Sequence, residues 1–348
     1  GDITYPEPPA YDNEKMKTLR IIVVRNHDNT VEQNRIISLP AADNTYTEEM
    51  KVVGNERKQI YLFVNEATQI KTVGFPRKLV DFDFSKIQVG SLFPTDYLSE
   101  LTIRLDEATE QIDGPLPMSE CHTVMLDDEG LEPDNGEQGQ TGEEGEKVVL
   151  KKKEITLKLT RAAVKFTYEI TNKSSRDYWL SVIRIDKSAS HEYLLPNGMT
   201  YDDAENVTDF QVPAAKYTPF NQLYKENKKL TAKSTEPVKL PSFYLSEGKY
   251  ENANDTYSDN TNGNNYKTSY KTAITLDTKD NSGEVLGDRA GNTSFGEFTL
   301  ESFFPNLSAL PRNTHVVVRI TINDANDISW QVDLRPYGEV VLEPEFGI

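Results

Sequence analysis

Cysteine is nearly absent from this chain, in which Cys121 is the single example among 348 residues. One cysteine excludes an intramolecular disulfide and a cysteine-rich zinc site. Long hydrophobic runs are lacking too, because no stretch approaches the roughly 20 apolar residues that a membrane-spanning helix needs. Residues 1–17 are neither basic nor hydrophobic enough for a signal peptide, so we expect that any targeting segment of the precursor has been removed.

Basic side chains are in the minority, because 38 Lys and Arg stand against 56 Asp and Glu for a formal net charge of −18. A nucleic-acid backbone or an anionic membrane surface would repel such a chain at long range, so we expect neither as a partner. Hydrophobic residues make up 36% of the chain, which is enough for ordinary cores. The length of the chain favours two domains.

Motifs for catalysis or metal binding are lacking as well. The histidines are scattered without the spacing of a zinc site: His27, His122, His191 and His315. No GxSxG, GxGxxG, phosphate-binding loop or HExxH motif occurs. Cys121 and His122 are neighbours that would point to opposite faces of a strand, and the polar stretches 259–265 and 277–284 lack the spacing of a calcium loop. We therefore expect no enzymatic activity, no metal and no cofactor.

Short segments rich in β-branched and aromatic residues, bounded by turn residues, dominate the chain. They predict strands at 18–26, 58–65, 178–186, 269–277, 314–322 and 328–334. An Asn/Asp turn between the last two predicts a hairpin. Helical patterns are confined to 97–112 and to a turn or two at 66–73. The sequence therefore predicts an all-β fold built of β-sandwiches.

Residues 153–170 alternate like a strand, but in two phases with Arg161 at the slip. The apolar residues before and after the slip are Ile155, Leu157 and Leu159, then Ala162, Val164, Phe166, Tyr168 and Ile170. A one-residue slip reverses the buried face of a strand. A bulge explains such a slip, but the segment is far longer than the usual strand of ~5–6 residues. We therefore predict two strands in tandem, at about 154–160 and 162–171.

This junction divides the chain into two expected β-sandwich domains, residues 1–160 and 161–348, joined without a flexible linker. Two polar stretches are expected to be surface loops. Residues 127–146 contain nine acidic side chains and no basic one, and residues 251–265 are rich in Asn, Asp and Gly.

The last residues, 338–348, alternate strictly, with Glu339, Glu343 and Glu345 mostly on one face. Val340, Leu342, Phe346 and Ile348 share the other face. Pro344 falls in the apolar phase and cannot donate to a ladder, so the segment is an edge strand or an extended arm. Two alternatives remain: a terminal strand folded onto its own sheet, or a strand added to a neighbouring molecule.

Several segments occur in an order that is more specific than any one of them. These are TLRIIVVRN (18–26) followed by ERKQIYLFVNEA, GPLPMSE (114–120), LTRAAVKFTYEIT at the phase slip, LPSFYLSEG (240–248), and the block that begins LPRNTHVVVRITI. In this order the chain resembles the fimbrillin family, the subunits of type V pili of gut and oral anaerobic bacteria.

The resemblance implies two tandem Greek-key, transthyretin-like β-sandwich domains with few short helices, and a junction that coincides with Arg161. It also implies export as a lipid-anchored precursor to the outer membrane, and a structural role in a cell-surface fimbrium that supports adhesion. The implied partners are other pilus subunits, with host or bacterial surface receptors as further partners. In the family, an arginine-specific protease removes the first strand, and a neighbouring subunit donates a strand to the groove.

One departure from the family pattern lies at the start of the chain. Residues 1–17 contain Pro6, Pro8 and Pro9 and make a poor strand. Either the first strand has been removed, or this is an anchor or accessory subunit that is not processed in that way. Val340, Leu342, Phe346 and Ile348 are the candidate donor residues.

Two other functions are alternatives to a pilus subunit. A surface carbohydrate-binding module would use exposed aromatic side chains, and several tyrosines are expected in loops: Tyr201, Tyr217, Tyr224 and Tyr257. Their scatter disfavours this alternative. A glycoside hydrolase would need two facing carboxylates, and nothing in the sequence selects a pair.

Overall fold

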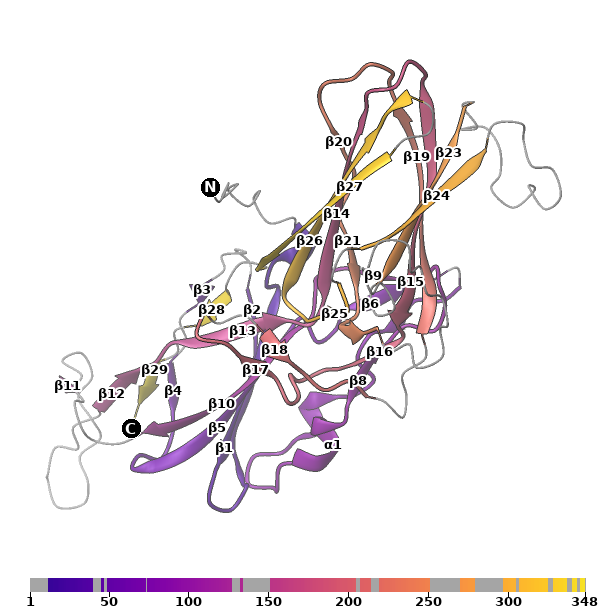
Figure 1. The fold of residues 1–348 in the computed structure, drawn as a ribbon. Helices are drawn as coiled ribbons and strands as arrows, with labels where there is room; N and C mark the ends of the chain where they lie inside the picture. The colour runs from indigo at the N-terminus through magenta and orange to yellow at the C-terminus, as the bar shows by residue number, and fades with distance from the viewer. Residues whose placement is uncertain are drawn as a thin grey trace, which may run out of the picture.

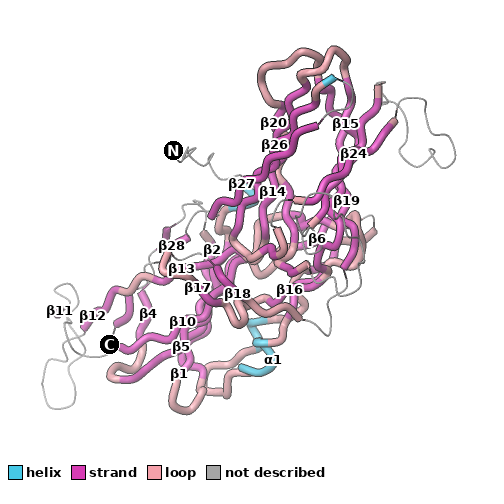
Figure 2. The backbone as a smooth tube through the Cα atoms, in the orientation of Figure 1, coloured by secondary structure: helices cyan, strands magenta, loops and turns pink. Residues whose placement is uncertain are grey.

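The chain folds into an elongated molecule made almost wholly of strands, as the computed structural model shows (Figure 1). The structure describes residues 12–39, 45–46, 49–72, 74–126, 132–133, 151–204, 207–213, 219–250, 270–278, 297–304, 307–324, 328–336, 340–342 and 345–347. Helix is limited to short segments there (Figure 2): η1 (Asp12–Glu14), η2 (Phe84–Lys86) and α1 (Thr95–Ser99). The predicted all-β fold class is confirmed. Among these residues, no helix is long and apolar enough to cross a membrane.

A seven-stranded sheet forms the lower half of the molecule in Figure 1. Its strands, in spatial order, are β2 (Val31–Ser38), β1 (Thr18–Arg25), β5 (Glu56–Val64), β10 (Met118–Leu126), β13 (Leu157–Arg161), β28 (Val340–Leu342) and β3 (Thr45–Tyr46). Strands β1 and β5 bury both of their faces. Ile22 packs into one hydrophobic cluster and Ile21 into another, which explains why TLRIIVVRN is a continuous apolar run.

Smaller sheets complete this half. A four-stranded sheet has the order β11 (Glu132–Pro133), β12 (Lys151–Glu154), β29 (Glu345–Gly347) and β4 (Glu49–Lys51). A three-stranded sheet has the order β7 (Arg77–Lys78), β6 (Gln69–Lys71) and β9 (Gln111–Asp113). Strand β8 (Thr102–Arg104) pairs with β16 (His191–Tyr193), so a segment from the later part of the chain joins this half.

Two further sheets enclose a single hydrophobic core in the upper half. One consists of β20 (Val238–Lys239), β14 (Val164–Asn172), β26 (Thr314–Ile322) and β27 (Ile328–Pro336), with β21 (Phe243–Leu245) also paired to β14. The other has the order β19 (Pro219–Leu230), β15 (Tyr178–Ala189), β23 (Lys271–Asp277) and β24 (Phe298–Phe303). Short ribbons pair β17 (Thr200–Tyr201) with β18 (Val207–Asp209), and β22 (Gly248–Lys249) with β25 (Ala309–Leu310).

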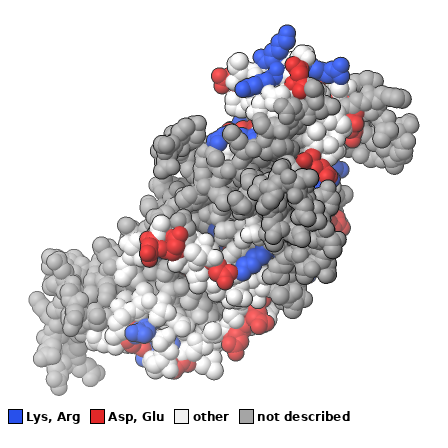
Figure 3. All heavy atoms as spheres, viewed as in Figure 1, with Lys and Arg blue, Asp and Glu red and all other residues white. Residues whose placement is uncertain are grey.

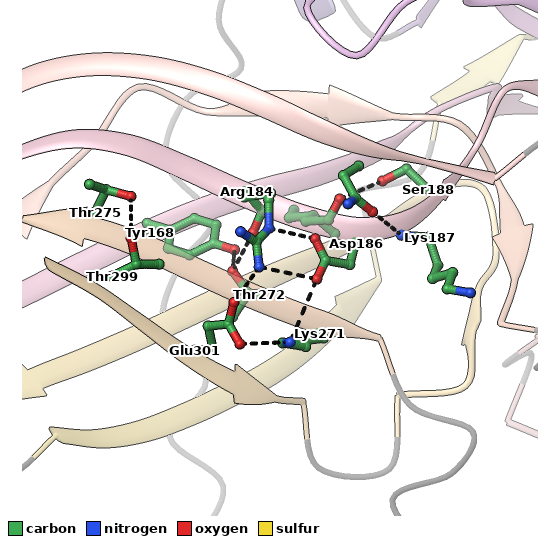
Figure 4. Close-up of polar contacts among 12 residues, drawn as sticks. Tyr168, Arg184, Asp186, Lys187, Ser188, Lys271, Thr272, Thr275, Thr299 and Glu301 are labelled. Atoms are coloured by element: carbon green, nitrogen blue, oxygen red, sulfur yellow. Dashed lines mark hydrogen bonds and ion pairs between the residues drawn. The ribbon is translucent and has the colours of Figure 1, made fainter. Parts of the chain in front are cut away.

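Ion pairs cross the β15, β23 and β24 ladder (Figure 4). Arg184 contacts Asp186 and Glu301, each at 2.6 Å, and Lys271 Nζ lies 2.7 Å from Glu301. The Tyr168 hydroxyl, which comes from the facing sheet, lies 2.7 Å from the Thr272 hydroxyl and carries a polar contact into the core. The two sheets are therefore joined by a hydrogen bond as well as by apolar packing.

The six predicted strands all occur, and β26 and β27 form the predicted hairpin with Ile322 opposite Ile328. The predicted helices are wrong. Helix α1 ends at Ser99, strands β8 (102–104) and β9 (111–113) with a turn between them follow in 97–112, and β6 occupies part of 66–73. Backbone pairing with distant segments overrides the local helical pattern in both places.

The phase slip at Arg161 corresponds to a change of sheet and not to a bulge. Strand β13 ends at Arg161 in the seven-stranded sheet, and β14 begins at Val164 in the five-stranded sheet. Ala162 and Ala163 lie between them and are fully buried. The backbone turns there under hydrogen bonds from Ala162 N to Pro117 O and from Asn313 N to Ala163 O, each 2.9 Å. The division into domains at 1–160 and 161–348 stays a prediction.

Candidate assembly site

The C-terminal strands lie between two other segments of the same chain. Strand β28 pairs antiparallel with β13 and parallel with β3. Strand β29 pairs antiparallel with β12 and parallel with β4. The end of the chain is therefore an interior strand, because its described residues have a hydrogen-bonding neighbour on each side (Figure 1).

One register runs along the whole pairing. On the antiparallel side, Leu159 is opposite Val340, and the same register continues to Lys152 opposite Gly347. On the parallel side, the register of Val341 with Thr45 also continues without a shift into β29. Register is strongly specified where one face of a sheet is buried. The slot between residues 45–51 and residues 151–161 therefore accepts a strand in one alignment.

The walls of this slot belong to a hydrophobic core. Leu157 and Leu159 on β13 are 2% and 3% exposed, and Met50 on β4 is 1% exposed. All three pack in one cluster with Leu62 and Leu126 from the centre of the seven-stranded sheet. An alternating apolar strand in the slot therefore lies beside two walls whose apolar side chains belong to the core.

The candidate donor residues are aligned with apolar residues of the two walls of this slot. Val340 and Leu342 are opposite Leu159 and Leu157, and Phe346 is opposite Met50 on the parallel side. Ile348 lies outside the described residues. Residues opposite one another in an antiparallel ladder share a face of the sheet. This register therefore aligns the apolar phase of 338–348 with the apolar phase of β13.

Arg161 marks the end of the wall formed by β13. Its backbone N–H donates to Asn313 Oδ1 at 3.4 Å, and the residue is 2% exposed. Asn313 directly precedes β26 of the five-stranded sheet. The slot is therefore anchored at this end to the neighbouring half of the molecule.

Sequence reasoning missed the second wall. Strands β3 and β4 are two and three residues long, and each pairs in parallel with a C-terminal strand. Such short segments carry too little alternation to be recognised. The single available signal was the repeated apolar spacing of Met50 and Val52, which both lie in the core.

Cys121 and His122, the one candidate nucleophile and base, have different partners. Although Cys121 is an exposed residue, partial desolvation of its thiol raises the pKa to about 11, which disfavours the reactive thiolate. His122 Nε2 lies 2.7 Å from the carbonyl oxygen of Lys158. In the part of the chain that the structure describes, no group of His, Cys, Asp and Glu side chains is arranged to hold a metal ion.

The tyrosines considered for carbohydrate binding do not form a common surface. Tyr201 is 53% exposed, whereas Tyr224 is a buried residue of β19 whose hydroxyl donates to Tyr244 O at 3.2 Å. The prediction of a loop position is therefore wrong for Tyr224, and also for Tyr201, which belongs to the short strand β17. Tyr217 and Tyr257 lie outside the described residues, as do most of the two polar stretches at 127–146 and 251–265.

Comparisons with known proteins give structural likenesses only. No family model and no curated protein sequence matches the chain. A tip fimbrial protein from Porphyromonas gingivalis is 12% identical with a TM-score of 0.48, over 93% of this chain and 95% of that one. A fimbrilin from the same organism is 11% identical, with a TM-score of 0.40, over 100% of this chain and 94% of that one. A fimbrial protein from Bacteroides vulgatus is 9% identical, with a TM-score of 0.41, over 92% of each chain.

These neighbours are fimbrial proteins, the class that the sequence resemblance indicates. At these identities and TM-scores, the likeness does not bear on the activity or the partners of the chain.

Proposed function

We propose that the chain is a structural subunit of a cell-surface fimbria that polymerises by exchanging its C-terminal strand between neighbouring subunits. The observation that carries the proposal is the two-sided pairing of β28 and β29 in one register. The role is non-catalytic. Other pilus subunits are the partners, and the precursor would be a lipid-anchored protein of the outer membrane.

Strand exchange requires that the same contacts can form within one chain or between two chains. A segment at the end of the chain that fills a slot in its own fold meets this condition, because a neighbour's segment can replace it residue for residue. An empty slot would leave two unpaired strand edges, and exposed edges promote pairing with another chain. The slot is therefore filled in either state, by its own strand or by a donated one.

The donated strand would contribute enough free energy to hold a polymer together. In the observed register, Val340 and Leu342 would join the face that holds Leu159 and Leu157, and Phe346 would lie beside Met50. Burying each such side chain contributes about 1.5–3 kcal/mol before the cost of ordering the strand. Backbone pairing on both sides adds specificity for the alignment.

Inter-chain disulfide formation tests the proposal directly. One tagged chain carries Leu159→Cys and a differently tagged chain carries Val340→Cys, both in a Cys121→Ser background. These positions are opposite one another in the antiparallel ladder, where Cα atoms lie within reach of a disulfide. We expect mixed polymers to contain a disulfide between the two tags, detected on non-reducing gels.

The matched control replaces Leu159→Cys by Lys158→Cys, which the register aligns with Val341 and places on the other face. That pair should not cross-link. Mixtures that yield only monomers, or polymers without the inter-chain disulfide, would contradict strand exchange.

A further inference from the structure

A basic surface lies at the upper end of this acidic molecule. The turn at 173–177, after β14, and the turn at 231–234, after β19, are joined by backbone hydrogen bonds. Lys233 N donates to Ser174 O and Ser234 N donates to Asn172 O, each at 2.8 Å. Lys and Arg side chains gather over this end in the space-filling view (Figure 3).

We call this surface the basic end and define it by six exposed cations: Lys173, Arg176, Lys228, Lys229, Lys233 and Lys239. Within the described residues, only Lys229 has an ion pair, at 3.5 Å from Asp177. Five carboxylates lie in these turns or on the paired strands: Asp177, Glu226, Glu236, Asp324 and Glu169, which is opposite Lys239. Asp177 also accepts from Ala232 N, Asp324 accepts from Ser175 N and Oγ, and Glu169 pairs with Arg319 at 3.2 Å, so three of the five are already engaged. The basic end is thus locally positive in a chain with a net charge of −18.

The same chain contains a segment of the complementary charge. Residues 127–146 carry nine acidic side chains and no basic one. Strands β11 and β12, which lie within and just after this acidic stretch, are at the end of the molecule opposite to the basic end (Figure 1). Glu132 of β11 would have to span the length of the molecule to reach the basic end of its own chain, whereas two chains in a row would bring the two together.

We infer that the basic end docks the acidic stretch, residues 127–146, of a second copy of this chain. The inference rests on the proposed function, since it gives the polymer a head-to-tail order. The acidic stretch and the basic end are different parts of the chain, so the contact is heterologous and continues along a filament.

Electrostatic docking of this kind acts mainly on the rate and direction of association. Opposite charges on two approaching ends raise the association rate and orient the encounter, and added salt weakens the effect. Because two copies that each carry −18 repel one another overall, a local attraction at one end selects a single orientation.

Peptide binding tests the inference separately from strand exchange. The probe is a fluorescent peptide of residues 127–146, titrated with the full chain at low ionic strength and followed by anisotropy. The variant Lys173→Glu/Lys228→Glu/Lys233→Glu reverses three exposed charges of the basic end. We expect its affinity for the peptide to fall at least about tenfold. The matched control Lys71→Glu/Lys78→Glu/Lys86→Glu reverses three exposed lysines of the other half and should change the affinity less than about twofold.

The peptide lacks the C-terminal strand, so its binding does not depend on strand exchange. If the inter-chain disulfide did not form but the peptide still bound, the proposed strand exchange would be contradicted and the docking contact would still be supported. Absent binding, or equal binding by the two variants, would overturn the inference. Binding of chondroitin sulfate at the basic end without binding of the peptide would also overturn it, and would assign the surface to an anionic polysaccharide.

Discussion

The Nζ atom of Lys165 lies 2.6 Å from Oε1 of Glu14, and the exposed fractions of the two side chains are 4% and 2%. The Tyr244 hydroxyl donates to the same carboxylate oxygen at 2.6 Å. Glu14 belongs to η1, before the first strand of the seven-stranded sheet, whereas Lys165 belongs to β14 of the five-stranded sheet. This buried ion pair therefore ties the start of the described chain to the second half of the molecule.

Replacing Glu14→Gln should destabilise the protein strongly. The Lys165 ammonium would stay buried without this carboxylate, and removing one partner of a buried pair typically costs about 3–5 kcal/mol. Urea unfolding followed by far-ultraviolet circular dichroism measures the loss. The matched control is Asp12→Asn, which breaks the exposed contact between Asp12 and Lys17 and should not change stability measurably. Equal stability of the two variants would contradict a structural role for the buried pair.

A second buried charge cluster predicts a dependence of stability on pH. Glu192 and Glu247 are 1% and 2% exposed, and both lie beside the fully buried guanidinium of Arg312. Arg312 Nη1 donates to Leu194 O at 2.9 Å, and Glu247 N donates to Glu192 Oε2 at 3.2 Å. Burial raises the pKa of Glu192 well above its ordinary value, and the nearby Arg312 offsets only part of this effect.

A carboxyl group with a raised pKa in the folded state binds its proton more tightly there than in the unfolded chain. Its favourable contribution is complete below the unfolded pKa of about 4.5 and is lost as the pH rises through the folded value. Glu192→Gln removes this titration. We therefore expect the free energy of unfolding of the variant, relative to the natural protein, to increase from pH 4.5 to pH 8.

Glu301→Gln is the control of opposite sign. Hydrogen bonds from Lys271 and Arg184 lower the pKa of Glu301, so this carboxylate stabilises the folded state above its unfolded pKa and loses the effect as the pH falls. The variant should be less stable than the natural protein at pH 8 and approach it in acid. Parallel pH profiles for Glu192→Gln and Glu301→Gln would show that the assigned environments are wrong.

The sequence predicted elements whose pattern is set locally. Strand β1 is a continuous apolar run because both of its faces are buried, and the tandem strands β13 and β14 are visible as a change of phase at Arg161. The local sequence pattern did not predict strand β8, because its extended conformation depends on pairing with β16, which is far along the chain.

The candidate site was predicted in part. The apolar alternation of 338–348 identified a strand with a specific face, but its neighbours β3 and β4 become strands only through pairing with it. Buried charges were not predictable at all. Glu14, Lys165 and Arg312 look like ordinary surface residues in the sequence, and only the packing of distant segments encloses them.

The turn at Asn313 gives the last prediction. Asn313 has a φ of 60°, its N–H donates to Ala163 O at 2.9 Å, and its Oδ1 accepts from Arg161 N at 3.4 Å. In this left-handed region, alanine is strained by its Cβ, whereas glycine is not. Asn313→Ala and Asn313→Gly both lose the side-chain contact, so the difference between their free energies of unfolding reports the backbone strain.

We expect Asn313→Ala to be less stable than Asn313→Gly by about 1 kcal/mol in urea unfolding. The comparison at Thr314, the first residue of β26, serves as the control. There the backbone is extended and glycine costs more entropy than alanine, so Thr314→Gly should be the less stable variant by about 0.5–1 kcal/mol. If alanine were the more stable residue at both positions, the left-handed turn that joins Arg161 and Ala163 to β26 would not exist as described.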